Sequence, residues 1–164
     1  AGALSLYPVD LKNCSPDYFA DLDNLPLFVA EIKKAQARDD DLEGDQRKLP
    51  CMLKIILDSL LHAGVSAPLV IGLLIRNSRC EVSSMSLDNE ALYIHKLVGV
   101  SELPTNNLQL GLLCPAIGPL KFARDVVAQT TKSIQARCSD LSRKARWCRP
   151  SYYVKGNRIP KASD

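Results

Sequence analysis

The sequence has little of what enzymes and metal sites usually require. Its 164 residues include only two histidines, His62 and His95, and neither lies in a His-Glu-x-x-His pattern. There is no Cys-x-x-Cys pair, no Gly-x-Ser-x-Gly elbow and no phosphate-binding loop. Asp58 is the only carboxylate between Asp45 and Glu81, so no paired acids lie in an apolar stretch. These absences predict a protein that is not an enzyme and that binds neither a metal nor a cofactor.

Aromatic residues are also scarce, at 5%, although hydrophobic residues as a whole make up 46%. The apolar set is therefore mainly Leu, Ile and Val, which pack more naturally on helix faces than in an aromatic-rich sheet. The length predicts one helical, disulfide-bonded domain at residues 1–150, followed by an irregular basic tail at residues 151–164.

Cysteines are present, but they are spread singly along the chain. An even number of isolated cysteines is more typical of disulfides than of a metal site, and it predicts three disulfides. Disulfides persist in oxidising compartments, so we expect a secreted, extracellular protein. The six cysteines are Cys14, Cys51, Cys80, Cys114, Cys138 and Cys148.

The stretch between Cys51 and Cys80 has no charge from Ser59 to Ile75. A transmembrane helix needs about twenty uninterrupted apolar residues, and this run is shorter and is broken by glycine and proline. We therefore expect a helical hairpin, with one helix beginning at Pro50 and a second over residues 66–76. Its two ends would bring Cys51 and Cys80 together, and we prefer this pair for one disulfide.

Apolar periodicity predicts further helices on both sides of this hairpin. Helical spacing of Leu25, Phe28, Val29 and Ile32 predicts a helix over residues 26–38, followed by a charged loop. A second amphipathic pattern predicts a helix over residues 120–141. Residues 81–114 fit either a helix over 88–99 or a hairpin. The predicted fold class is mainly α, a compact disulfide-linked bundle of about six short helices. The alternative is α+β, with a small hairpin near residues 81–98.

Charge is distributed unevenly although the net charge is only +3. Residues 1–46 contain ten acidic and four basic side chains, whereas residues 115–164 contain three acidic and eleven basic ones. The basic end predicts a patch that binds an anionic surface. Nucleic acid is not expected as a partner of an extracellular disulfide protein. The residues of this patch are Arg143, Lys144, Arg146 and Arg149.

The leading functional hypothesis is a secreted, non-enzymatic binding protein that holds an apolar small molecule or lipid between amphipathic helices. The alternative is a secreted signalling, toxin or effector protein that acts through a receptor or another protein surface. A second copy of the chain could equally shield helix 66–76, which leaves a homodimer open. The candidate ligand-binding residues are Leu57, Leu61, Leu69, Leu73 and Leu74.

Overall fold

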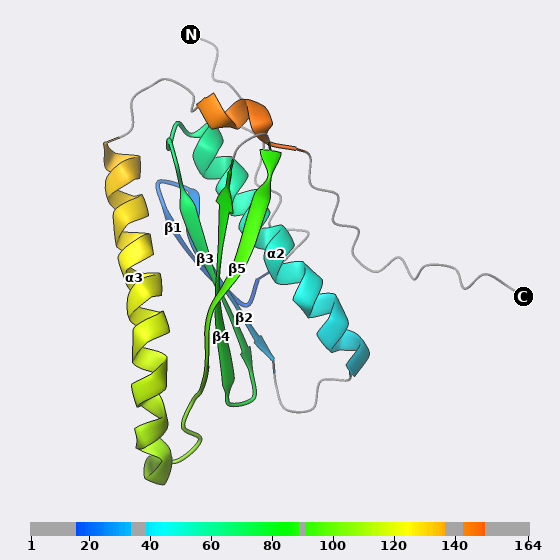
Figure 1. Ribbon diagram of the computed structural model, residues 1–164, viewed down its shortest axis with the longest axis vertical. Coiled ribbons are helices and arrows are strands. Elements are labelled where there is room, and N and C mark those ends of the chain that lie inside the picture. Colours follow the sequence, from blue (N-terminus) through cyan, green and yellow to red (C-terminus); the bar gives the residue numbers. More distant parts are fainter. Residues whose placement is uncertain (1–15, 34–38, 89–90, 137–142, 150–164) are drawn as a thin grey trace, which may run out of the picture.

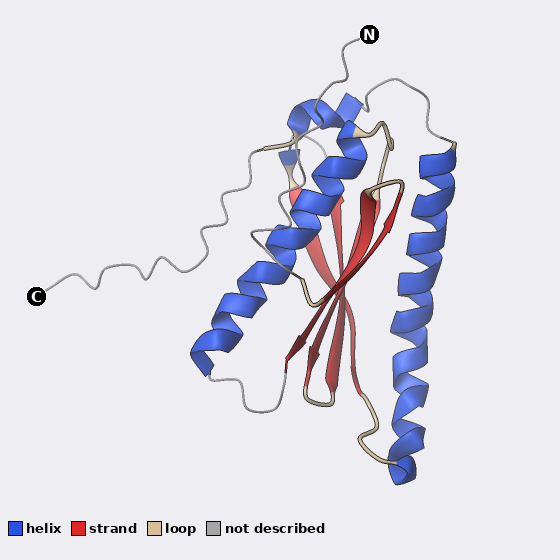
Figure 2. Ribbon diagram, turned by 180° about the vertical axis from the view of Figure 1, so that it is seen from behind, coloured by secondary structure: helices blue, strands red, loops and turns tan. Residues whose placement is uncertain are grey.

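The computed structural model describes residues 16–33, 39–88, 91–136 and 143–149. Its fold is α+β: a mixed five-stranded sheet in the order β1-β2-β3-β4-β5, with one long helix on each face (Figures 1 and 2). In chain order the elements are β1 (Tyr18–Leu22), β2 (Leu25–Lys33), α2 (Asp39–His62), β3 (Leu69–Arg76), β4 (Arg79–Leu87), β5 (Tyr93–Glu102), η2 (Asn107–Leu112), α3 (Leu113–Gln135) and η3 (Arg143–Trp147).

Strand direction in the sheet follows from the connections. Two residues, Asp23 and Asn24, join β1 to β2, and both have positive φ values (52° and 62°), as a tight hairpin turn requires. Asn77, with φ 55°, turns β3 into the antiparallel β4. Only β2 and β3 are parallel neighbours, and parallel strands need a long crossover. The helix α2 provides that crossover.

One face of the sheet packs against α2 and forms the larger core. The helix buries one complete side, where Met52, Leu53, Ile56, Leu57, Leu60 and Leu61 have no exposed surface. They pack against β2 and β3 side chains such as Val29 and Val70. Gly72 of β3 allows close approach, because a β-carbon there would lie 2.8 Å from Cδ1 of Leu49.

The other face packs against α3 and forms a smaller cluster. Ala123 and Val126 of α3 contact Ile71 of β3 and Val82 of β4. At Gly99 of β5 a β-carbon would lie 2.5 Å from Cγ of Pro119. The helix therefore lies almost directly on the backbone of β5 at this point.

The predicted fold class is wrong, and the two strands buried on both faces explain most of the error. Residues 26–38 and 66–76 were predicted as helices, but they contain β2 and β3. Both faces of β3 are buried, as Val70 and Ile71 show, so its sequence has no polar alternation that would indicate a strand. The expected helix over 88–99 is also wrong. The alternative hairpin is present as β4 and β5, within a much larger sheet.

The predicted disulfides are a second correction. Cys51, Cys80, Cys114 and Cys148 are free thiols, and the preferred pair Cys51–Cys80 is wrong. Cys80 is buried beside Val82 in the cluster under α3, whereas Cys51 lies on α2, across the sheet. Cys14, Cys138 and the tail 151–164 lie outside the described residues. The secreted location depended on the disulfides and stays a prediction.

The helices that do occur were partly predicted. The helix expected from Pro50 lies within α2, which begins earlier, at Asp39, where a charged loop was predicted. The amphipathic helix expected over 120–141 corresponds to α3, described from Leu113 to Gln135. No described helix combines the length and the apolar character needed to cross a membrane.

Candidate functional site

Charged side chains gather on the α2 face of the sheet, at the carboxyl ends of β2 and β3. Along β2, alternation places Val29, Glu31 and Lys33 on this face, but only Val29 belongs to the apolar core. In open sheets, ligands commonly bind outside the carboxyl ends of parallel strands. The groups at this end of the sheet are therefore candidates for a binding site.

Glu31 is the most unusual of these groups, because it is a buried carboxylate. Its side chain is 1% exposed, and its Oε1 lies 2.5 Å from Nζ of Lys48 on α2 and 3.3 Å from Nζ of Lys33. Its second oxygen, Oε2, is buried and has no hydrogen-bond partner within the described ranges. Burying a polar atom without a partner costs free energy, so this oxygen requires a water molecule or a cation as its partner.

Asp17, the residue just before β1, lies beside Glu31 of β2. Tyr18 pairs with Ala30, so the antiparallel register places the preceding residue, Asp17, opposite Glu31. Oδ2 of Asp17 accepts a hydrogen bond from the backbone amide of Ile32 at 2.7 Å. Residues opposite one another have β-carbons about 5 Å apart. Asp17, just before β1, therefore lies opposite Glu31 of β2, which contacts Lys33 and Lys48.

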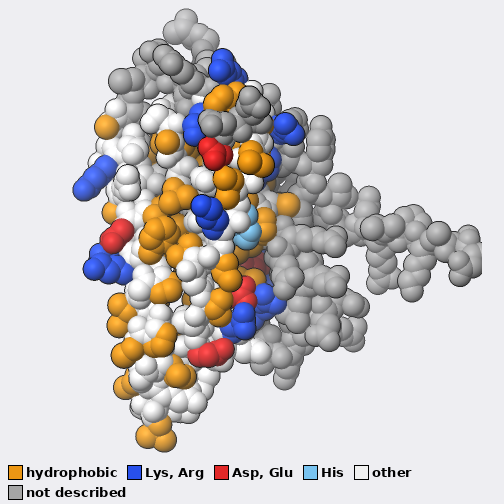
Figure 3. Space-filling view, viewed as in Figure 1, with side chains coloured by type: hydrophobic (Ala, Val, Ile, Leu, Met, Phe, Trp, Pro, Cys, Tyr) orange, Lys and Arg blue, Asp and Glu red, His pale blue; other side chains and the backbone are white. Residues whose placement is uncertain are grey.

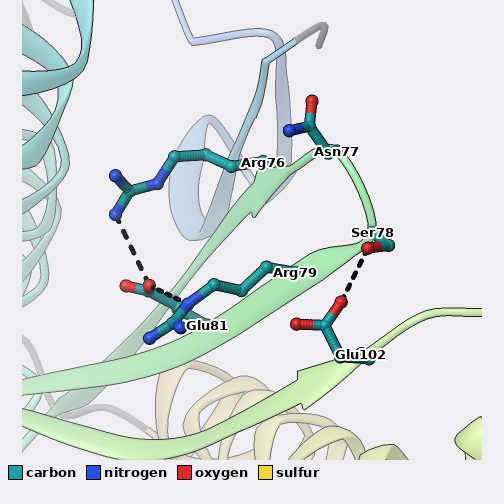
Figure 4. Close-up of a pocket in the computed structure, with 6 residues that line it drawn as sticks. All are labelled: Arg76, Asn77, Ser78, Arg79, Glu81 and Glu102. Carbon is teal, nitrogen blue, oxygen red and sulfur yellow. Dashed lines mark hydrogen bonds and ion pairs between the residues drawn. The ribbon is translucent and has the colours of Figure 1, made fainter. Parts of the chain in front are cut away.

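A pocket of about 520 Å³ lies next to this group, at the turn between β3 and β4 (Figure 4). Oε1 of Glu81 accepts from Nε of Arg79 at 2.8 Å and from Nη2 of Arg76 at 3.4 Å. Oγ of Ser78 donates to Oε2 of Glu102 at 2.6 Å. The pocket is lined by Arg76, Asn77, Ser78, Arg79, Glu81 and Glu102.

The pocket and the carboxylate pair are neighbours in the sheet. Lys33 pairs with Arg76, and its carbonyl accepts a hydrogen bond from the amide of Asn77 at 3.3 Å. Glu31 pairs with Leu74, which in turn pairs with Glu81. Neighbouring strands lie about 4.8 Å apart, so the backbones of Glu31 and Glu81 are about 10 Å apart. Together the two groups form one polar region along the ends of β2, β3, β4 and β5, which we call the strand-end site.

As a metal site, the strand-end site offers few protein ligands. No group of three or more His, Cys, Asp or Glu side chains suited to a metal ion occurs in the part of the chain that the structure describes. A closed zinc site is therefore not formed by these residues. Mg²⁺ is different, because it often uses only one or two carboxylates and takes its other ligands from water and substrate phosphates. Asp17 and Glu31 match that smaller requirement.

A second polar cluster lies at the other end of α2 and fixes the segment 143–149. Oδ1 of Asp58 accepts from the Tyr93 hydroxyl at 2.6 Å, and Oδ2 accepts from Nζ of Lys54 at 2.7 Å. Burial and the hydrogen bond to Asp58 raise the pKa of Tyr93. Burial and the negative charge of Asp58 raise the pKa of the Cys148 thiol to about 12. A neutral thiol with so high a pKa is a poor nucleophile, so this cluster is structural.

The residues of the predicted basic patch lie at this second cluster and not at the strand-end site. Arg143 begins η3, and Nζ of Lys144 donates to the carbonyl of Leu87 at 2.9 Å. The guanidinium of Arg146 lies 5.5 Å from the ring centre of Trp147, and the amide of Arg149 donates to the Tyr93 hydroxyl at 3.2 Å. Two of the four residues thus help to attach the segment, and binding to an anionic surface stays a prediction.

The five predicted ligand-binding leucines do not come together. Leu57, Leu61 and Leu74 are buried in the core under α2. Leu69 and Leu73 pack with the cluster under α3, on the other side of the sheet. Because the sheet separates the two groups, they cannot line one shared cavity.

The strand-end site does not follow from the predicted helix over residues 26–38, which contains Glu31 and Lys33. In a helix the two side chains would point in different directions, whereas in a strand they share a face. The sequence does contain a signal for this site. It is an apolar run that ends in Glu31-Ile32-Lys33, shortly after Asp17. No protein-family model matches the chain, and no curated protein or solved structure is significantly similar to it.

Proposed function

We propose that the protein is a hydrolase that cleaves phosphodiester bonds with the help of a divalent cation bound by Asp17 and Glu31. The observation that carries the proposal is the buried, unpartnered Oε2 of Glu31, which lies on the strand beside Asp17. A divalent cation would satisfy this oxygen, and Mg²⁺ commonly completes such a pair of carboxylates with water and phosphate oxygens.

Each neighbouring group has a role in this proposal. Lys48 holds Oε1 of Glu31 at 2.5 Å, which fixes the carboxylate and leaves Oε2 for the cation. Lys33, 3.3 Å from the same oxygen, brings a positive charge to the place where a phosphate would bind. Such a charge stabilises the additional negative charge that develops on the phosphoryl oxygens in the transition state.

The reaction itself needs only water as a second substrate. When bound, a divalent cation would lower the pKa of water and neutralise phosphate charge. The water oxygen attacks phosphorus, the bond from phosphorus to one ester oxygen breaks, and a proton passes to that leaving oxygen. The protein therefore has to supply binding and charge, which Asp17, Glu31 and Lys33 provide.

This proposal differs from the expectation of a non-enzymatic lipid carrier. The leucines named for lipid binding are divided by the sheet, whereas the charged groups of the strand-end site converge. The receptor-directed alternative and the homodimer stay predictions.

Cation binding and hydrolysis test the proposal together. We expect the full chain to bind Mn²⁺ by electron paramagnetic resonance and to hydrolyse bis(4-nitrophenyl) phosphate with Mg²⁺ or Mn²⁺ but not with EDTA. Asp17→Asn and Glu31→Gln should each lower the rate at least about a hundredfold, and both should weaken Mn²⁺ binding.

The matched control is Asp125→Asn, which removes an exposed carboxylate on α3, far from the site. It should behave as the unchanged protein. Asp17 is exposed, so Asp17→Asn should keep the native melting temperature and serve as the decisive variant. Full activity and Mn²⁺ binding in folded Asp17→Asn would refute the proposal, as would an inactive unchanged protein that binds no cation.

A further inference from the structure

The pocket at the β3–β4 turn contains two arginines with unused bonding capacity. The Arg79 side chain is 54% exposed and uses only its Nε in the ion pair with Glu81. Arg76 reaches Glu81 through Nη2, while its Nε is buried without a hydrogen-bond partner among the residues described. A buried donor without an acceptor is costly, and an anion in the pocket would supply the acceptor.

One oxygen of each carboxylate in the pocket accepts a hydrogen bond from a pocket residue. Oε1 of Glu81 holds both guanidinium groups, and Oε2 of Glu102 accepts from Ser78 (Figure 4). Glu81 thus acts as the residue that orients the two arginines. The planar, permanently charged guanidinium group suits phosphate, because its parallel N–H groups match two phosphate oxygens.

The position of this pocket relative to Glu31 and Asp17 decides what it can bind. The turn hydrogen bonds to the end of β2 through Asn77 and Lys33, and the two groups lie two strands apart. A phosphate held at the cation would therefore have the arginine pocket beside it and not across the molecule. A substrate with a single phosphate would leave Arg76 and Arg79 paired only with Glu81.

We infer that the pocket of Arg76 and Arg79 is a second anion subsite, which holds the phosphate next to the one being hydrolysed. The inference rests on the proposed function and specifies its substrate as a chain with a phosphate on successive units. A nucleic-acid strand has this chemistry, since each of its nucleotides carries one negative charge. The two arginines would bind the backbone and would read no base sequence.

Two substrates separate this subsite from the cation site. Bis(4-nitrophenyl) phosphate has one phosphate and needs only Asp17 and Glu31. A fluorescently labelled single-stranded octadeoxynucleotide has neighbouring phosphates and would use both subsites. For the oligonucleotide, Arg79→Gln should raise KM about tenfold with little change in kcat. It should also reduce the slope of log KM against log salt by about one. Hydrolysis of bis(4-nitrophenyl) phosphate should not change.

Arg76→Gln should also raise KM for the oligonucleotide. Arg124→Gln should leave KM unchanged, because Arg124 belongs to α3, on the other side of the sheet. Arg79 is exposed, so its variant should fold normally, which a thermal melt verifies. An unchanged KM for the oligonucleotide in Arg79→Gln would overturn the subsite while leaving the proposed function intact. So would an unchanged protein that cleaves the small diester but not the oligonucleotide. An unchanged protein that cleaves neither compound would refute both proposals.

Discussion

The two helices cover the sheet in different ways. On one face, α2 buries an unbroken side of large aliphatic residues and, where the apolar surface ends, meets the charged strand-end site. On the other face, α3 buries fewer large side chains: its buried residues are Ala116, Ala123, Val126, Thr130 and Ile134. Its outer surface keeps apolar side chains in contact with solvent, among them Leu113 and Ile117 (Figure 3). The α2 face therefore buries more of the large aliphatic side chains and also carries the candidate site.

Truncating one leucine on each helix gives the largest expected contrast. Leu60→Ala removes a side chain with no exposed surface and should cost about 2–5 kcal/mol of unfolding free energy, because it leaves a cavity. Leu113→Ala removes a side chain that is 39% exposed and should cost less than about 1 kcal/mol. Urea denaturation measures both values. Equal losses would show that α3 contributes as much to the core as α2 does.

Adding one methyl group to the sheet under each helix should give a smaller difference in unfolding free energy. Here the larger loss is expected under α3. At Gly99 the new β-carbon would meet the ring of Pro119 at 2.5 and 3.1 Å, and a proline ring cannot rotate away. Gly99→Ala should therefore cost about 1–3 kcal/mol. At Gly72 the nearest atom, 2.8 Å away, is the end of the Leu49 side chain, which can change rotamer. Gly72→Ala should cost less in the same denaturation experiment, and the reverse order would contradict the stated packing of α3 on β5.

Alkaline pH should lower the stability of the contacts between the carboxyl-terminal end of α2 and residues 143–149. This effect should be smaller than those of the substitutions above. The folded chain raises the pKa of Cys148 from 9.0 to about 12, and it also raises that of Tyr93. The protonated groups therefore stabilise the fold fully below about pH 9, and this contribution is lost as the pH rises towards 12. Melting temperatures between pH 8 and 11 should fall more steeply in the unchanged protein than in Cys148→Ser with Tyr93→Phe. Parallel curves would contradict this account.

The parts of the fold that were predictable are those with one buried face. The inner stripe of α3 and the second half of α2 have an apolar side and a polar side, so their period is visible in the sequence. The strands β2 and β3 are apolar on both sides and give no such period. Their identity depends on pairing with each other across the whole of α2, and local sequence does not contain that information.

The strand-end site was hidden for the same reason. Lys33 and Arg76 are forty-three positions apart, and the parallel register of β2 and β3 makes them neighbours. The even number of single cysteines was misleading in a different way, because isolated thiols can also be buried as small apolar residues, as Cys80 is.

The parallel pairing of β2 and β3 also has a consequence for the order of folding. The strands β3, β4 and β5 follow one another through short turns and can form early, whereas β2 has to wait for the crossover through α2 to close. Contacts between residues distant in sequence form slowly, because the chain loses entropy before they are made. Glu31 and Lys33 therefore reach Arg76 only in the last stage of assembly. A nascent or partly folded chain would have the arginines in place without Glu31 and Lys33 beside them, so the proposed activity would require the completed sheet.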